Sequence, residues 1–448
     1  MVKVITYGTF DMLHYGHVNL LKRAKALGDY LIVGITSANY DRYRGKLNVK
    51  DSLMERIENV RQTGLADEII VEEYEGQKID DIVEKKVDIF AIGSDWTGYY
   101  DYLNDYCKVV YLERTRGVSS TDLRDKEHKF LRFGIVGTGR IANRFVPEAK
   151  FVSGMGVDSV LDIREDLAKA YAEKHELSFY TTDYGQMLER VDAVYIASPH
   201  QTHYGYAKRA LLAGKHVLCE KPMALHAGEA DELFALARER GLVIMEGLKT
   251  LHCPGFQRMV SLAKSGRIGE IKSVDAAFTK LVPSGSREIQ DLEAGGSVTE
   301  LATYPALAIY KLLGLDYRDV RFTSYKKEGE GVDLFTKIDL YYDKAVATAK
   351  VGVGVKTEGS LVISGTRGYI YVPAPWWKTD YFEMRFEDLS KTRKFFYEFV
   401  GDGLRYELVE FIRQVAKGSM EESYCDCSRN LIALIETYRR GDKTTVIE

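Results

Sequence analysis

The feature that most constrains this chain is a unit in which a β-branched strand runs into glycine and a helix follows, and the unit occurs twice. The first has a strand at 2–7, then Gly8, then apolar residues at helical spacing over 13–27. The second has a strand at 130–136 that ends at Gly137. Strands that alternate with helices indicate a parallel sheet wrapped by helices, and a pattern that restarts predicts a second domain.

The composition is that of a folded protein of two or three domains: the chain has 448 residues, 29% of them charged, and a formal net charge of -4. This charge offers no basic surface for nucleic acid, and no apolar stretch approaches the roughly 18 residues of a membrane span, so neither partner is expected. Because the first strand starts at once, without a basic and apolar leader, we expect a cytoplasmic location. None of the five cysteines forms a CxxC pair, so no metal site is predicted.

The last part of the sequence changes character. From residue 273 onwards apolar and polar residues alternate, most clearly at 334–342, 345–351 and 368–372. This period predicts an open, mainly antiparallel sheet with one solvated face, through which we expect the chain to form homo-oligomers. Helices are expected at 404–417 and 428–438.

Residue types suited to phosphate follow the first strand. His14 and His17 are three residues apart at a helix start, so they share a face, and Gly16 removes a side chain where a phosphate must approach. Backbone N–H groups and the positive helix end favour an anion there, and two imidazoles can stabilise charge on an α-phosphate. The alternative is that both histidines only cap and pack the helix. A cation and hydroxyls in 114–121 favour the phosphate site.

Several segments carry a resemblance to a known family: Tyr7–Asp11, His14–His17, Glu55–Val60, Gly93–Trp96 and Arg114–Thr121. With them, residues 1–127 resemble the glycerol-3-phosphate cytidylyltransferase family of HxGH nucleotidyltransferases. The resemblance implies transfer of CMP from CTP to a phosphorylated small alcohol, with Mg²⁺ and release of pyrophosphate. It implies catalytic roles for His14, His17 and Arg114, and nucleotide binding by Thr9, Phe10, Lys46, Ser119, Ser120 and Thr121. The family often has other residue types at Tyr74, Ser94 and Arg116, which leaves the acceptor alcohol open.

A GxGxxA pattern, formed by Gly137, Gly139 and Ala142, lies between the strand and the helix of the second unit, which is the context that a dinucleotide fingerprint requires. Gly137 suits the tight turn, Gly139 lets a pyrophosphate approach, and Ile141 and Ala142 open the helix that packs on the strand. Asp162 ends the next strand, where an acid can bind ribose hydroxyls, whereas Arg164 could accept a 2′-phosphate. The predicted cofactor is therefore NAD or NADP.

Glu220, Lys221 and Pro222 follow a later strand, and a lysine beside a nicotinamide could polarise a carbonyl or donate a proton. Together with the GxGxxA pattern and 266–270, this run resembles the Gfo/Idh/MocA oxidoreductase family from residue 129 to the C-terminus. The resemblance implies that Glu220 contributes to the cofactor site.

The same resemblance implies a catalytic group in the second domain of that oxidoreductase. Glu300 and Tyr304, which we expect one helical turn apart, would point together into the cleft. Tyr304 would donate a proton to the substrate oxygen, with Lys221 lowering its pKa. His200, His203 and His252 are secondary candidates for substrate contact, and each could equally be structural.

The sequence thus predicts an α/β protein with a Rossmann-like cytidylyltransferase domain at 1–127, an NAD(P)-binding Rossmann domain at 128–247 and an α+β substrate and oligomerisation domain at 248–448. The leading hypothesis is a bifunctional enzyme that reduces a phosphorylated sugar or ketose to a polyol phosphate and couples that product to CMP. CDP-alcohols of this kind would feed capsule or teichoic-acid-like polymers. Two alternatives are open: the oxidoreductase acts on the CDP-linked product, or one domain is a non-catalytic regulatory module.

Overall fold

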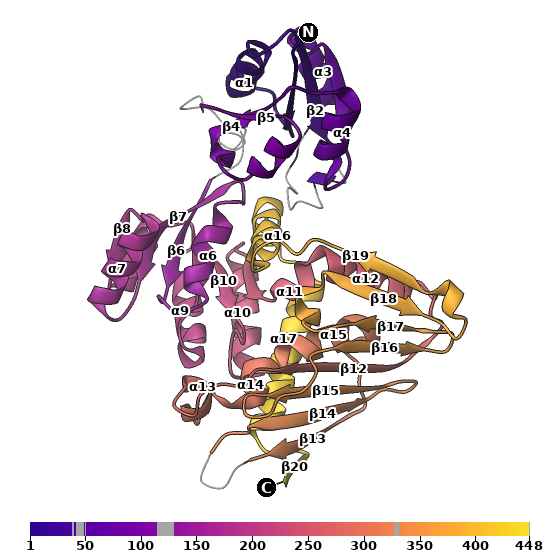
Figure 1. The fold of residues 1–448 in the computed structure, drawn as a ribbon. Helices are drawn as coiled ribbons and strands as arrows, with labels where there is room; N and C mark the ends of the chain where they lie inside the picture. The colour runs from indigo at the N-terminus through magenta and orange to yellow at the C-terminus, as the bar shows by residue number, and fades with distance from the viewer. Residues whose placement is uncertain (38–39, 42–48, 50, 114–129, 327–330, 448) are drawn as a thin grey trace. The chain divides into compact units, whose positions relative to one another are not determined.

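The computed structural model describes residues 1–37, 40–41, 49, 51–113, 130–326 and 331–447. The chain forms two compact units, Met1–Phe130 and Leu131–Glu448 (Figure 1). The predicted boundary between residues 127 and 128 lies outside the described residues. The second unit opens with strand β6 (Leu131–Val136), where the sequence pattern restarts.

The first unit is a parallel sheet with the strand order β3-β2-β1-β4-β5. Val4 and Ile5 are neighbours on β1 but are buried in different apolar clusters, so both faces of the sheet are covered. The order reverses between β1 and β4, the point at which such sheets bind ligands. The elements are β1 (Lys3–Gly8), α1 (Tyr15–Lys25), β2 (Tyr30–Thr36), α3 (Leu53–Gln62), β3 (Glu68–Glu72), α4 (Gln77–Lys85), β4 (Ile89–Gly93), η1 (Ser94–Trp96), η2 (Asp101–Asp105) and β5 (Lys108–Leu112).

The second unit starts with another parallel sheet, with the order β11-β10-β9-β6-β7-β8. Its order reverses between β6 and β9, as in dinucleotide-binding folds. After β6 come α6 (Ala142–Ala149), β7 (Met155–Leu161), α7 (Glu165–His175), β8 (Phe179–Thr181), α8 (Tyr184–Arg190), β9 (Ala193–Ile196), α9 (His200–Leu212), β10 (His216–Glu220), α10 (Ala227–Glu239) and β11 (Ile244–Gly247).

A larger, mixed sheet follows, with the order β19-β18-β17-β16-β12-β15-β14-β13-β20. The pairs β12–β15 and β13–β20 are parallel and the other described pairs are antiparallel, so the prediction of a mainly antiparallel sheet is confirmed. Along β14, Ile338 and Leu340 are fully buried and Asp339 between them is not, which is the expected alternation. The strands are β12 (Ile271–Thr279), β13 (Asp319–Tyr325), β14 (Phe335–Tyr341), β15 (Val346–Gly352), β16 (Leu361–Gly365), β17 (Tyr369–Val372), β18 (Tyr381–Arg385), β19 (Arg393–Phe396) and β20 (Thr444–Ile447).

Helices and short turns connect these strands and cover the buried side of the sheet. Buried residues of α12, α15 and α17 belong to the same apolar cluster as the inward residues of the strands. The elements are α11 (Lys249–His252), α12 (Pro254–Lys264), α13 (Arg287–Gln290), α14 (Gly296–Leu301), α15 (Thr303–Leu313), η3 (Trp376–Lys378), η4 (Leu389–Lys391), α16 (Leu404–Lys417) and α17 (Glu422–Arg439).

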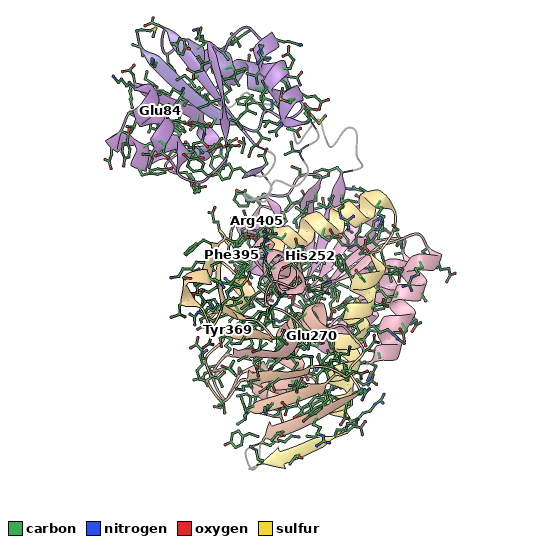
Figure 2. All side chains as sticks on the ribbon, turned by 90° about the vertical axis from the view of Figure 1, so that its right-hand side faces the viewer. Glu84, His252, Glu270, Tyr369, Phe395 and Arg405 are labelled. Carbon is green, nitrogen blue, oxygen red and sulfur yellow. The ribbon has the colours of Figure 1, made fainter. Side chains whose placement is uncertain are left out.

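The last two helices tie the two sheets of the second unit together. Leu404 and Phe411 of α16 are buried in the core of the parallel sheet, whereas Leu434 of α17 is buried in the core of the mixed sheet. Arg405, labelled in Figure 2, forms a buried bidentate ion pair with Glu148 of α6, with N–O distances of 3.0 and 2.9 Å. The predicted domain at 248–448 therefore contains a helix that also completes the Rossmann core. No helix in the described ranges is long and apolar enough to cross a membrane.

Candidate active sites

The loop after β1 holds backbone strain at the edge of the first sheet. Phe10 and Met12 have φ angles of 51° and 48°, which non-glycine residues rarely adopt. Hydrogen bonds fix this loop: Asp51 accepts from the Met12 N–H, and Asp11 accepts from the Asp51 N–H, both at 2.9 Å. Strain that the surroundings hold in place is characteristic of ligand-binding loops.

The two predicted histidines come together as expected. The rings of His14 and His17 are stacked, with centroids 3.9 Å apart, and the Phe10 ring meets His17 edge-on at 5.5 Å. His14 is also the N-cap of α1, because its Nδ1 accepts the Gly16 N–H at 3.0 Å. A neutral ring that accepts through Nδ1 carries its proton on Nε2, which is the form that donates to a phosphate oxygen. Capping and phosphate binding are therefore compatible.

A buried ion pair supports this loop from below. Arg56 on α3 is fully buried and its Nη1 donates to Thr9 O and Thr36 O, each at 2.9 Å, and to Asp41 Oδ2 at 3.0 Å. Asp41 also accepts from Thr9 Oγ1 at 2.9 Å. Thr9, which the sequence assigns to nucleotide binding, is thus held on both its side chain and its carbonyl. Arg56 was not predicted to act here, because the burial of an arginine on an otherwise amphipathic helix gives no sequence signal.

The remaining predicted residues of this site lie outside the described residues: Lys46, Arg114, Ser119, Ser120 and Thr121. Of the predicted transferase site, the structure therefore places Thr9, Phe10, His14 and His17. The described segments contain no group of three or more His, Cys, Asp or Glu side chains that could hold a metal ion.

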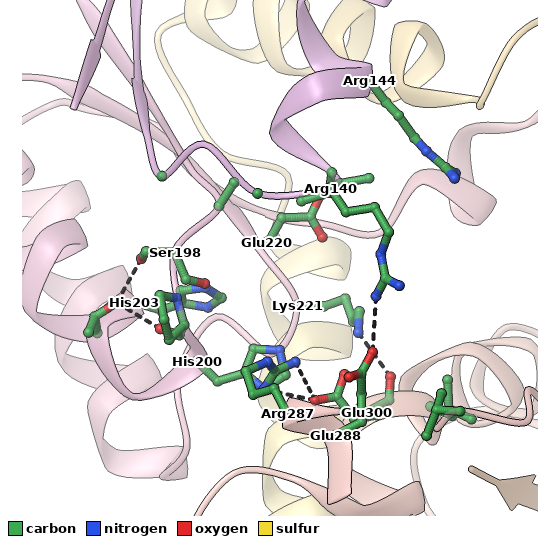
Figure 3. A pocket seen from close by; sticks show the side chains of 18 of the residues that line it. Arg140, Arg144, Ser198, His200, His203, Glu220, Lys221, Arg287, Glu288 and Glu300 are labelled. Carbon is green, nitrogen blue, oxygen red and sulfur yellow. Dashed lines mark hydrogen bonds and ion pairs between the residues drawn. The ribbon is translucent and has the colours of Figure 1, made fainter. Parts of the chain in front are cut away.

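A cavity of about 1240 Å³ lies in the second unit, beyond the carboxyl ends of β6, β7, β9 and β10 (Figure 3). Single-ligand pockets are usually about 300–1,000 Å³, so this one has room for a dinucleotide and a second molecule. Gly137 has φ +94°, and a Cβ there would lie 2.8 Å from Ala197 O, so the tight turn needs glycine. At Gly139 a Cβ would meet one atom of the described residues, Ala197 O at 3.9 Å, so the space above it is left for a ligand.

Asp162 joins the glycine turn to the end of β7. Its Oδ2 accepts from the N–H and the hydroxyl of Thr138, at 3.2 and 2.7 Å, and its Oδ1 accepts from the Arg164 N–H at 3.1 Å. Asp162 and Arg164 both line the cavity, as do Gly137, Gly139 and Ile141, whereas Ala142 is fully buried beneath the turn. These residues fit a dinucleotide, because glycine backbone, a helix start and a carboxylate meet at one strand edge.

Lys221 and Tyr304 face the same cavity. The Lys221 ammonium donates to Glu300 O at 2.9 Å and lies 5.8 Å from the centre of the Tyr304 ring. Burial, and then the Glu220 carboxylate, raise the pKa of Tyr304 above its usual range. The expected lowering of that pKa by Lys221 is not found: burial and nearby carboxylates raise the pKa, and the cation that lowers it in part is Arg144. A phenol with a raised pKa stays protonated at neutral pH, which suits a proton donor.

Glu300 lines the cavity with Tyr304, but the two do not lie on one uninterrupted helix, since α14 ends at Leu301 and α15 begins at Thr303. The buried Glu300 carboxylate pairs with Arg287 at 2.6 Å, a residue that the sequence did not single out. Figure 3 shows this pair beside Lys221. Glu300 therefore positions a cation in the cavity. Glu220 also lines the cavity and accepts from the Tyr195 hydroxyl at 2.6 Å.

The three secondary histidines have different surroundings. His203 is fully buried, and its ring nitrogens lie 2.8 Å from Pro222 O and 2.8 Å from Ser198 O, which favours the structural alternative. His200 lines the cavity, and burial holds its pKa well below the usual range, so it is neutral there. Burial also lowers the pKa of His252, to about 4, and this residue packs edge-on against Tyr424, away from the large cavity.

These features define a class of protein: a nucleotidyltransferase and an NAD(P)-dependent oxidoreductase on one chain. Comparison with known families agrees with both halves. Residues 5–126 match the cytidylyltransferase-like family, residues 131–248 match the oxidoreductase family with an NAD-binding Rossmann fold, and residues 256–371 match the GFO/IDH/MocA C-terminal domain. The chain is a cytidylyltransferase-like domain fused to oxidoreductase domains of the Gfo/Idh/MocA family, which the matches place within residues 131–371.

Individual relatives support the same division. The chain is 47% identical over 124 residues to a glycerol-3-phosphate cytidylyltransferase of Bacillus spizizenii, a match that covers 28% of this chain and 95% of the relative. It is 37% identical over 190 residues to dTDP-3,4-didehydro-2,6-dideoxy-alpha-D-glucose 3-reductase of Actinomadura kijaniata, covering 42% of this chain and 57% of that protein. A solved 3-ketoreductase from the same organism, in complex with NADP and TDP-benzene, superposes with a TM-score of 0.65 and 27% identity, over 71% of this chain and 99% of that one.

Proposed function

We propose that the two halves act in sequence on one small alcohol. The oxidoreductase reduces a phosphorylated sugar or ketose to a polyol phosphate with NAD(P)H, and the transferase couples that product to CMP and releases pyrophosphate. The observation that carries the proposal is the fusion itself. A polyol phosphate is what a cytidylyltransferase of this family consumes, and a carbonyl reductase is what can supply one. The CDP-polyol would then serve polymers of the capsule or teichoic-acid type.

In the transferase half, the stacked His14 and His17 would receive the α-phosphate of CTP, which enters with Mg²⁺. Their N–H groups would donate to the oxygens on which charge grows as the polyol phosphate attacks in line. The buried pair of Arg56 and Asp41 would keep Thr9 and the strained loop in place during this step. Lys46 and Arg114 would neutralise the charge of the triphosphate.

In the oxidoreductase half, NAD(P)H supplies the hydride when it is bound at the glycine turn. Tyr304 would donate its proton to the carbonyl oxygen as that oxygen becomes an alkoxide. Lys221 lies next to the Tyr304 ring and would stabilise the negative charge left behind. Arg287, held by Glu300, adds a second positive charge to the same wall.

A second candidate function has one specific observation in its favour. One relative is named as a reductase of a dTDP-linked sugar, and a solved 3-ketoreductase from the same organism holds TDP-benzene beside NADP. The oxidoreductase of this chain would then act on the CDP-linked product, after the transferase.

A substrate panel tests the proposal. The purified full chain is offered ketose and aldose phosphates with NADH or NADPH, and loss of the reduced cofactor is followed by absorbance. Polyol phosphates with CTP are tested in parallel by pyrophosphate release. Reduction of a free sugar or ketose phosphate supports the first order of reactions. Reduction of CDP-linked carbonyl compounds alone supports the second order. If NAD(P)H is not oxidised with either class of compound, both orders are contradicted.

A further inference from the structure

The cavity of the second unit continues past Tyr304 along an aromatic wall. The Phe278 ring meets Tyr304 edge-on at 4.7 Å and stacks on Trp377 at 3.8 Å, with 11° between the ring planes. All three side chains line the cavity. A substrate whose carbonyl carbon lies at Tyr304 would therefore place the rest of its length along Phe278 and Trp377.

Positively charged side chains border this wall. Lys280 comes directly after β12 ends at Thr279, Lys378 follows Trp377 directly, and both line the cavity. Lys356 reaches the same place, since its ammonium donates to Thr279 O at 3.0 Å. Arg144 of α6 lines the cavity from the Rossmann half, and its side chain is visible in Figure 3.

Within the described residues, the ion pairs of these four cations involve a single carboxylate, that of Asp402. Asp402 Oδ1 accepts from both Arg144, at 3.1 Å, and Lys378, at 3.3 Å, so one carboxylate holds two cations side by side. The Lys280 ammonium forms no ion pair within the described residues, although the carboxylates of Glu288 and Glu300 lie near enough to raise its pKa in part. Burial, and then Arg140 and Arg144 nearby, lower its pKa below the usual value for lysine. Like charges gathered in a cavity are relieved when an anion binds.

We propose that Arg144, Lys280, Lys356 and Lys378 form a subsite for the phosphoryl groups of the reductase substrate, on the far side of the aromatic wall from Tyr304. This inference extends the proposed function and rests on it, because the proposed function is what identifies the substrate as a phosphorylated carbonyl compound. The ligand chemistry is a phosphate ester or diphosphate, which could belong to a free sugar phosphate or to a CDP-linked carbonyl compound.

Kinetics of NAD(P)H oxidation by the full chain test the subsite. Lys280→Gln and Lys378→Gln are each compared with Lys272→Gln, a matched control on the same strand as Phe278 that pairs with the exposed Glu270 at 2.9 Å. The KM is measured for a free sugar phosphate, for the CDP-linked compound, for the unphosphorylated carbonyl compound and for NAD(P)H. The substrate whose KM changes, either the free sugar phosphate or the CDP-linked compound, is the one whose phosphoryl group binds at the subsite.

For the phosphorylated substrate, Lys280→Gln and Lys378→Gln are expected to raise the KM about 10- to 100-fold, because each removes a charge-assisted contact. The KM for the unphosphorylated compound and for NAD(P)H should change less than about threefold, and Lys272→Gln and Lys280→Arg should stay near wild type. An equal rise for phosphorylated and unphosphorylated compounds, or a rise confined to NAD(P)H, overturns the proposal.

A binding measurement separates failure of this subsite from failure of the proposed function. If no carbonyl compound is reduced, the proposed function fails, but the full chain can still be titrated with pyrophosphate by calorimetry. Lys280→Gln should then bind pyrophosphate at one site fewer than wild type and Lys272→Gln do. Any pyrophosphate site in the first unit should be present in all three proteins. Identical titrations of wild type and Lys280→Gln overturn the subsite.

Discussion

Replacing Gly139 by alanine tests whether that glycine is kept for a ligand rather than for the fold. In the part of the chain that the structure describes, a Cβ at Gly139 would approach only Ala197 O, at 3.9 Å, and the backbone there is outside the left-handed region. The stability of Gly139→Ala should therefore stay within about 0.5 kcal/mol of wild type. Gly137→Ala is the matched contrast: its Cβ would lie 2.8 Å from the same oxygen at φ +94°, and a loss of about 1–3 kcal/mol is expected.

Gly139→Ala should weaken cofactor binding although it leaves the stability nearly unchanged. The added methyl of Gly139→Ala would displace the pyrophosphate from the turn and cost about 1.5–3 kcal/mol of charge-assisted hydrogen bonding, which is a rise in Kd of about 10- to 100-fold. Fluorescence titration with NADH or NADPH gives the Kd, thermal unfolding gives the stability, and CMP transfer by the first unit is the internal control. If Gly139→Ala binds the cofactor as tightly as wild type, the assignment of this turn to the dinucleotide is refuted.

Three further substitutions test other parts of the account. Tyr304→Phe should lower kcat for carbonyl reduction about 10²- to 10⁴-fold with little change in the KM for NAD(P)H, and unchanged kcat would exclude Tyr304 as proton donor. Arg56→Met removes the cation of the buried ion pair with Asp41, so we expect the first unit to lose about 3–5 kcal/mol of stability and CMP transfer while carbonyl reduction persists; retained CMP transfer would argue against the supporting role. Burial raises the pKa of Glu246 from 4.5 to about 7. The free energy of unfolding should therefore fall as the pH rises from 4.5 to about 7, where the buried carboxyl becomes ionised. Glu246→Gln should therefore gain about 3 kcal/mol relative to wild type between pH 4.5 and pH 7, measured by urea unfolding, and a constant difference across that range would contradict the shift.

Local patterns were sufficient to predict the two parallel sheets and the strand at which the second unit starts. The strands at 334–342, 345–351 and 368–372 correspond to β14, β15 and β17, because alternation reports which side of a strand is buried. Alternation cannot report which strands pair, so the parallel pairing of β12 with β15 had no signal. The return of α16 to the Rossmann core also depends on contacts between residues far apart in sequence, such as Glu148 with Arg405.

The candidate sites were predictable where a backbone motif fixes them. The glycine turn and the His14–His17 pair follow from spacing within one turn, so the sequence places them correctly. The charges that surround Tyr304 do not follow from spacing. Lys280, Lys378 and Arg144 come from three separate segments, and each is an ordinary exposed type of residue until the fold brings it to the cavity wall. The pKa of Tyr304 was predicted in the wrong direction for the same reason, because burial is a property of the assembled fold.

Dependence of CMP transfer on the reduced cofactor is the most direct test of the central claim that one half makes what the other consumes. The full chain is mixed with CTP, Mg²⁺ and a sugar or ketose phosphate, and pyrophosphate release is followed with and without NADH or NADPH. We predict that pyrophosphate appears only when the reduced cofactor is present, in an amount equal to the cofactor oxidised. Pyrophosphate release at the same rate without the cofactor would contradict the claim.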